Sequence, residues 1–121
     1  MPKVAGLTDD FFNTESAFSK MKKSAVFMNI GRGTTVKEED LAKALNDGTI
    51  AGAVLDVFKT EPLPKENPLW ECKNLLLTPH CADQDREFMH RSMATFAKNL
   101  NLFGEGGEAA LINVCDKQKG Y

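Results

Sequence analysis

The sequence lacks the features that mark several protein classes. Its three cysteines, Cys72, Cys81 and Cys115, are odd in number and widely spaced, which argues against a disulfide framework and predicts a reducing compartment. No apolar run approaches the roughly 20 residues of a membrane-spanning helix. A net charge of -2 predicts no nucleic-acid partner. The first residues do not form a signal peptide, so a cytoplasmic location is the default prediction.

Two ligand-binding patterns are also missing. Neither C-x-x-C nor H-x-x-x-H spacing occurs, so no metal site is predicted. The phosphate-binding pattern G-x-G-x-x-G is absent, because Gly31-Arg32-Gly33 provides only its first half. Proline is scarce and concentrated: three of the five prolines lie in residues 59–71, KTEPLPKENPLWE, which are predicted to form a loop.

What the sequence does contain is three short apolar runs that predict strands. They are Ser24–Ile30, Ala51–Phe58 and Asn74–Thr78. The first is apolar almost throughout, which is typical of a strand covered on both faces. Alternation of these strands with helices predicts an α/β fold with parallel pairing.

Three helices are predicted between and after the strands. A short helix is expected over Glu15–Lys22. A second is expected to begin near Val36, because Thr35 and Glu38 have the spacing of a capping box, and Gly48 is placed to end it. A long helix is expected from about Asp83 to Phe103, with apolar residues at helical spacing.

Polar groups follow the predicted strands where ligands bind an open parallel sheet. Arg32 follows the first strand, Asp56 and Glu61 the second, and His80 the third. A guanidinium can bind a substrate carboxylate, a histidine can protonate a carbonyl oxygen, and a carboxylate can hold that histidine in its charged form. Position alone leaves another interpretation open, since each is also an ordinary residue type for a solvated loop.

The motifs NIGRG, AGAVLDVFKTEP and LLLTPH, in this order and spacing, resemble the D-isomer-specific 2-hydroxyacid dehydrogenases of the glyoxylate/hydroxypyruvate reductase type. The resemblance implies that Arg32 binds the substrate, that Glu61 tunes the histidine, and that His80 is the acid/base. It also implies NAD or NADP as cofactor, with Asp56 at its nicotinamide end. The complete implied cofactor-binding set is Ile30, Gly31, Arg32, Asp56, His80, Cys81, Ala82 and Asp83.

The same resemblance implies a domain organisation. Residues 1–103 would be the second half of a Rossmann-type NAD(P)-binding domain with a long helix that packs on a missing substrate domain, and residues 104–121 the tail of that substrate domain. The family's phosphate-binding loop would lie upstream of this sequence. The complete protein is expected to be a homodimer that acts on a small 2-oxo or 2-hydroxy acid, without nucleic-acid or membrane partners.

Two other functions remain open. The C-terminal-binding corepressors resemble this family and keep the same three residues in a dinucleotide-sensing interaction module, and the chain could instead be an inactive truncated product. Because half of the sheet would be missing, we expect the 121-residue chain alone to reduce no 2-oxo acid. We also expect it to self-associate through the first strand, whose outer edge and apolar side chains would lose cover.

Overall fold

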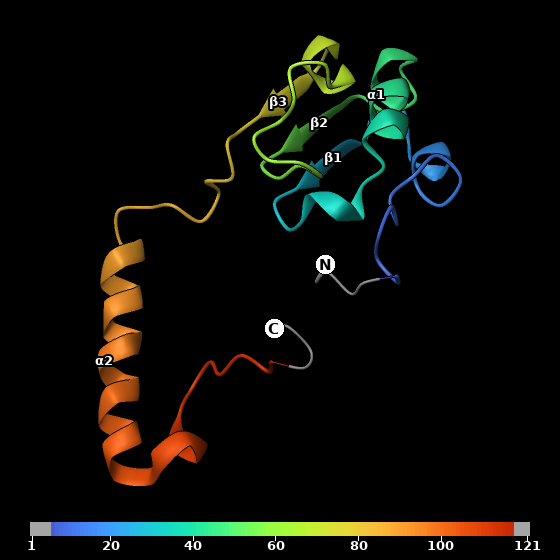
Figure 1. Ribbon diagram of the computed structural model, residues 1–121. Helices are drawn as coiled ribbons and strands as arrows, with labels where there is room; N and C mark the ends of the chain where they lie inside the picture. Colours follow the sequence, from blue (N-terminus) through green and yellow to red (C-terminus); the bar gives the residue numbers. More distant parts are fainter. Residues whose placement is uncertain (1–5, 118–121) are drawn as a thin grey trace. The chain divides into compact units, whose positions relative to one another are not determined.

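The computed structural model describes residues 6–117, and its central element is a three-stranded parallel sheet (Figure 1). The strands β1 (Val26–Asn29), β2 (Gly52–Leu55) and β3 (Leu75–Leu77) lie side by side in the order β1-β2-β3. Each lies inside its predicted run and is shorter than that run at both ends. The predicted α/β class and parallel pairing are therefore confirmed.

Helix α1 (Glu38–Asn46) connects β1 to β2 and contributes its apolar side chains to the core. It ends where predicted, since Gly48 lies just beyond it with a φ of +67° that favours glycine. Each large apolar side chain buried here stabilises the fold by about 1.5–3 kcal/mol. The largest fully buried side chains of the core are Phe18, Leu41, Leu55, Leu69 and Val36.

The other face of the sheet is exposed. Val26 and Met28 of β1 are 62% and 61% exposed, and Leu76 of β3 is 58% exposed. The apolar run of the first strand is typical of a strand covered on both faces, but one face of β1 is uncovered here, as we expected for the 121-residue chain. Alternate side chains of a strand point to opposite faces, so the core cluster that contains Phe27 and α1 covers only one of them.

The start of α1 also differs from the prediction. The helix begins at Glu38 rather than near Val36, after the short 3-10 helix η2 (Gly33–Thr35). No capping box forms, because the Thr35 hydroxyl donates to the carbonyl oxygen of Arg32, 2.7 Å away. The buried Glu38 carboxylate instead accepts hydrogen bonds of 2.7 Å from the Lys59 N–H and from the Asn67 side chain. Glu38 thus fixes the loop after β2 on the start of α1.

Two further segments, one predicted as a helix and one as a loop, each contain a short 3-10 helix. The expected helix over Glu15–Lys22 is only the 3-10 helix η1 (Phe18–Lys20), preceded by turns. The Asn13 side chain accepts from the Ser16 N–H and so turns the backbone locally. The proline-rich loop contains the 3-10 helix η3 (Pro68–Glu71), which the Asn67 side chain caps.

The chain divides into two compact units, one that ends at Ala82 and one that begins at Asp83. The second unit contains α2 (Phe88–Gly106) and the 3-10 helix η4 (Gly107–Ala110). The Asn99 side chain holds the segment after η4 through two hydrogen bonds to the Ile112 backbone, of 2.9 and 3.0 Å. Among residues 6–117, no helix combines the length and the apolar character needed to span a membrane.

The second unit differs from its predicted form in its boundaries. The long helix runs from Phe88 to Gly106, whereas the sequence predicted Asp83 to Phe103. Asp85 turns the backbone before the helix, because its side chain accepts from the Glu87 N–H at 2.7 Å. None of the α2 side chains is buried. Residues 1–5 and 118–121, which the predicted domain division includes, lie outside the described residues.

Candidate active site

The candidate residues lie beyond the carboxyl ends of the three strands. Arg32 follows β1, Asp56 directly follows β2, Glu61 lies in the next loop, and His80 follows β3. Because the strands are parallel, all three carboxyl ends meet at the same edge of the sheet. This is the edge at which open α/β sheets bind ligands.

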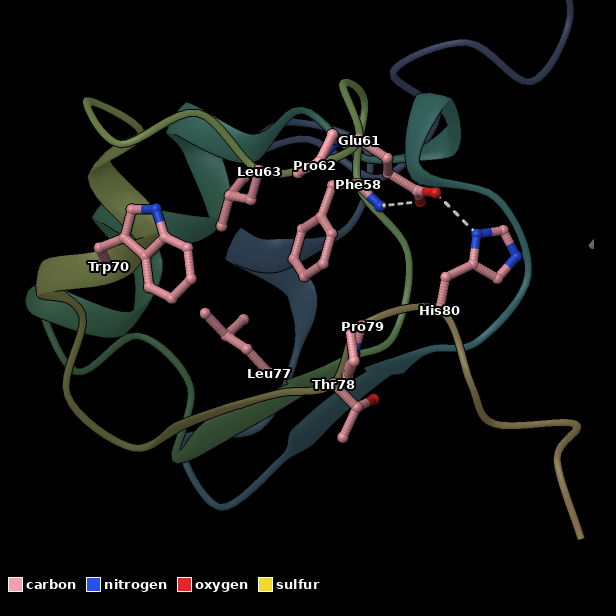
Figure 2. Close-up of a pocket in the computed structure, with 9 residues that line it drawn as sticks. All are labelled: Phe58, Glu61, Pro62, Leu63, Trp70, Leu77, Thr78, Pro79 and His80. Carbon is pink, nitrogen blue, oxygen red and sulfur yellow. Dashed lines mark hydrogen bonds and ion pairs between the residues drawn. The ribbon is translucent and has the colours of Figure 1, made fainter.

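Glu61 and His80 form a direct pair at this edge (Figure 2). The His80 Nδ1 lies 2.7 Å from Glu61 Oε2, and the other carboxylate oxygen of Glu61 accepts the Phe58 N–H at 2.9 Å. Glu61 is therefore held by its own loop while it orients the imidazole. The other ring nitrogen, Nε2, lies on the side of the ring away from Glu61.

The pair shifts both titrations in the direction that favours a charged pair. The hydrogen bond from His80 to Glu61, and then the Glu61 charge, raise the pKa of His80 above its ordinary value of 6.5. The same hydrogen bond, and then the Phe58 N–H, lower the pKa of the Glu61 carboxyl below its ordinary value of 4.5. A larger fraction of His80 is therefore protonated near neutral pH than of an isolated histidine.

Arg32 shares a cavity of about 240 Å³ with this pair. The guanidinium is exposed, and within residues 6–117 it makes one hydrogen bond, 2.7 Å from Nη1 to the Gly31 carbonyl oxygen. A second cation of the cavity, Lys59, is already paired with Asp10 at 2.8 Å. The cavity is lined by Arg32, Gly33, Thr34, Val57, Phe58, Lys59, Glu61 and His80.

Gly33 sets how closely the two loops of this cavity approach each other. A Cβ atom at position 33 would lie 1.9 Å from the carbonyl carbon of Phe58 and 2.0 Å from its oxygen. Only glycine therefore allows the Arg32 turn to pack directly on the loop that carries Glu61. The sequence showed glycines on both sides of Arg32, but it did not indicate this contact.

A second, larger cavity is also lined by Glu61 and His80 (Figure 2). It measures about 510 Å³, and most of its lining is apolar. The Trp70 Nε1–H donates to the Pro64 carbonyl oxygen at 2.9 Å. The cavity itself had no signal in the sequence, since it is assembled from the ends of a strand and a loop. Its lining residues are Phe58, Glu61, Pro62, Leu63, Trp70, Leu77, Thr78, Pro79 and His80.

Asp56 is placed differently from the other candidates. It is 2% exposed, and its carboxylate accepts hydrogen bonds from the Thr78 hydroxyl and from the Cys81 and Ala82 N–H groups. The Thr78 hydroxyl first, and then the two N–H groups, hold the pKa of this carboxyl below its ordinary value. The carboxylate predicted to contact a cofactor is therefore turned largely toward its own chain.

The other predicted cofactor-binding residues lie in both units. Ile30 and Gly31 follow β1, and Ile30 is 60% exposed. Cys81 and Ala82 are the last residues of the first unit, whereas Asp83 belongs to the second. All three cysteines are free, and the described residues contain no group of three or more side chains suited to hold a metal ion.

The fold and the site together define an α/β protein of the kind that binds ligands at the carboxyl edge of a parallel sheet. The family model of the D-isomer specific 2-hydroxyacid dehydrogenase NAD binding domain matches residues 5–82. The chain belongs to this family.

Curated relatives and solved structures agree with this assignment. A glyoxylate reductase from Aeropyrum pernix is 46% identical over 92 residues, which are 76% of this chain and 28% of the relative. An uncharacterised protein from Corynebacterium melassecola is 43% identical over 98% of this chain and 39% of its own. The NADPH-dependent glyoxylate/hydroxypyruvate reductase of Sinorhizobium meliloti, solved with NADP and sulfate, matches all of this chain and 38% of its own, with 31% identity and a TM-score of 0.82. The chain thus spans about a third of the length of the curated relatives it matches.

Proposed function

We propose that this chain forms the catalytic edge of an NAD(P)-dependent reductase that interconverts a 2-oxo acid and a D-2-hydroxy acid of the glyoxylate or hydroxypyruvate type. The observation that carries the proposal is the Glu61–His80 hydrogen bond of 2.7 Å beside Arg32, around one cavity. The names of the relatives support the same chemistry, because they include glyoxylate and hydroxypyruvate reductases.

Each residue of the set has one part in the proposed reaction. Arg32 binds the substrate carboxylate by paired hydrogen bonds and polarises the adjacent carbonyl. A reduced nicotinamide, when bound, supplies the hydride that reaches the carbonyl carbon. His80 gives the proton on Nε2 to the carbonyl oxygen, which completes the 2-hydroxy acid, and takes it back in the reverse direction. Glu61 stabilises the imidazolium and fixes the ring through Nδ1.

The residues present fit the nicotinamide end of such a cofactor. The exposed Ile30 provides an apolar surface beyond β1, at the same edge as His80. The cavity beside the pair is small, at about 240 Å³, which suits a short 2-oxo acid. No G-x-G-x-x-G loop is present in this sequence, so the proposal assigns only the nicotinamide end to this chain. The predicted domain division and the homodimer remain predictions.

The test is an assay of NADH and NADPH oxidation with glyoxylate and with hydroxypyruvate. We would measure the 121-residue chain alone and a chimera in which it replaces the aligned segment of a related glyoxylate reductase. We expect turnover by the chimera and none by the chain alone, because pyrophosphate binding at a helix N-terminus positions the cofactor and the required glycine loop is absent from this sequence.

Variants of the chimera separate the roles. We expect His80→Ala to lower kcat by roughly 10²–10⁴-fold, with little change in cofactor affinity. His90→Ala is the matched control, since His90 is the other histidine of the chain and lies on α2, in the second unit. Arg32→Ala should raise KM, because Arg32 binds the substrate carboxylate, and should also lower kcat, because Arg32 polarises the carbonyl. Turnover by the chain alone would contradict the need for an upstream phosphate site, and an unchanged kcat in His80→Ala would remove His80 from the reaction. Cofactor binding by the chimera without turnover would favour the interaction-module alternative.

A further inference from the structure

Asp56 makes an unusual number of bonds to the segment that carries His80. Its backbone carbonyl oxygen accepts the His80 N–H at 2.8 Å. Its carboxylate accepts the Cys81 N–H at 2.9 Å, the Ala82 N–H at 3.0 Å and the hydroxyl of Thr78. Since a proline at position 79 has no N–H, one aspartate binds every backbone N–H from position 79 to the end of the first unit.

The backbone of His80 needs such support. Its φ is +52°, in the left-handed region that is unfavourable for residues other than glycine. A residue keeps this conformation only when its surroundings hold it there. The bonds of Asp56 act on both sides of the strained residue, at Thr78 before it and at Cys81 and Ala82 after it.

The negative charge of Asp56 strengthens its hydrogen bonds to Thr78, Cys81 and Ala82. Hydrogen bonds from N–H groups to an ionised carboxylate are roughly twice as strong as those to a neutral oxygen. The side chain is almost completely buried, and its bonds favour the ionised form. A buried carboxylate with three donors is stable only while those donors stay in place. Asp56 therefore stabilises the conformation of residues 78–82, and these residues in turn stabilise the buried Asp56 carboxylate.

We infer that Asp56 is a positioning residue: it locks residues 78–82 in the conformation that directs the His80 imidazole at Glu61. This inference rests on the proposed function of His80. If residues 78–82 were free to change conformation, the imidazole could turn away from Glu61, and the 2.7 Å bond from Nδ1 would be lost. Asp56 thus acts on the reaction through the geometry of His80 rather than by touching the substrate.

The rival explanation is that Asp56 acts on His80 through its charge alone. The charged groups that act on His80 are Glu61 and Asp56, which raise its pKa, and Arg32, which lowers it. Asp56→Asn removes the charge and also weakens the bonds, so it cannot separate the two explanations. Asp56→Glu keeps the charge but moves the carboxylate by one methylene, which breaks the fit to the Cys81 and Ala82 N–H groups.

The experiment measures the His80 pKa by NMR titration of the imidazole in the 121-residue chain, with no substrate or cofactor. We expect both Asp56→Glu and Asp56→Asn to lower the His80 pKa toward the value found in Glu61→Gln, in which the partner itself is removed. Amide hydrogen exchange at Cys81 and Ala82 should rise by roughly tenfold to a hundredfold in the same variants. Asp47→Asn, which removes an exposed aspartate outside the site, should change neither quantity.

Thr78→Val provides a second variant for the same titration. If the Asp56 variants do not fold, Thr78→Val removes one bond and keeps every charge, and it should lower the His80 pKa by less than Glu61→Gln does. An unchanged His80 pKa in Asp56→Glu, or in Thr78→Val where that variant alone folds, would overturn the inference in favour of charge alone. A failure of the proposed enzyme activity would leave this titration intact, so the two proposals fail separately.

Discussion

At the scale of single residues, the chemistry of this chain is concentrated in one hydrogen bond. Glu61 and His80 are half-exposed, so their pairing depends on geometry as well as on burial: Phe58 holds the carboxylate and Asp56 holds the histidine segment. An exposed ion pair without such support contributes little, because two mobile side chains lose entropy when they meet. Here backbone hydrogen bonds already order both partners: the Phe58 N–H binds the Glu61 carboxylate, and the Asp56 carbonyl oxygen binds the His80 N–H.

The first prediction concerns the pH dependence of this pair. The raised pKa of His80 stabilises the fold fully below about pH 6.5, and this contribution is lost as pH rises through the folded-state value. The lowered pKa of Glu61 stabilises the fold above about pH 4.5, and this contribution is lost as pH falls. We therefore expect Glu61→Gln to reduce the unfolding temperature more between about pH 5 and 6 than above pH 8. An equal reduction at both pH values would contradict a charged pair.

The second prediction concerns Gly33. Because an added Cβ would lie within 2.0 Å of the Phe58 backbone, the loops must separate, and Gly33→Ala should destabilise the fold by about 1–3 kcal/mol or more. Gly104→Ala is the control: the added Cβ meets open space within α2, and we expect a gain of roughly 0.5–1 kcal/mol. Urea unfolding measures both. Equal stability of Gly33→Ala and the unmodified chain would show that the loops can separate freely.

At the scale of elements, α1 is fixed by a buried side chain rather than by an N-terminal cap. Glu38 accepts from the Lys59 backbone and the Asn67 side chain, so the first turn of the helix is joined to the loop that carries Glu61, at positions before and after it. Neither Glu61 nor His80 lies within a strand or helix. Glu61 lies in the loop after β2 and His80 follows β3, and α1 is bonded to the Glu61 loop through Glu38.

The third prediction follows from this connection. Glu38→Ala leaves the Lys59 N–H and the Asn67 amide without their acceptor, and we expect a loss of about 1.5–3 kcal/mol of unfolding free energy. Glu39→Ala, at the exposed neighbouring position, should stay within about 0.5 kcal/mol of the unmodified chain. Denaturant unfolding compares the two variants. Similar losses at both positions would mean that the buried bonds of Glu38 contribute no more than a surface charge.

At the scale of the whole molecule, the main feature is apolar surface that the described chain leaves exposed. One face of the sheet presents Val26, Met28 and Leu76, each more than half exposed. The helix of the second unit carries apolar residues at spacings of four and three, all exposed. These α2 residues are Met89, Met93, Phe96, Leu100 and Phe103. Soluble monomers rarely expose contiguous apolar surface of this kind.

The fourth prediction is that the 121-residue chain associates with itself. The exposed side chains of Val26 and Met28 lie on β1, which within residues 6–117 pairs only with β2 and leaves its outer edge open. Sedimentation should therefore give a mass that rises with concentration, and Met28→Lys should shift the chain toward monomer. A monodisperse monomer that unfolds cooperatively would contradict this expectation.

The sequence by itself determined the α/β class, the parallel strands, the end of α1 and the strand-end positions of Arg32, Glu61 and His80. These features depend on local patterns: apolar runs, a glycine beyond a helix, and motifs of fixed spacing. It also predicted a capping role for Thr35, where the structure instead shows a bond to the Arg32 carbonyl oxygen. The cofactor contact implied for Asp56 remains a prediction, beside the bonds that its carboxylate makes within the chain.

Only the tertiary structure decided which polar groups meet across long separations in sequence. Glu38 meets Lys59 across 21 residues, Asp56 meets Ala82 across 26, and the backbone at position 33 closes on Phe58. No local pattern encodes these contacts, because each depends on where the parallel sheet brings two separate loops. The exposed face of β1 was decided in the same way: an apolar run predicts a strand that can be covered on both faces, but cover depends on which elements pack against it.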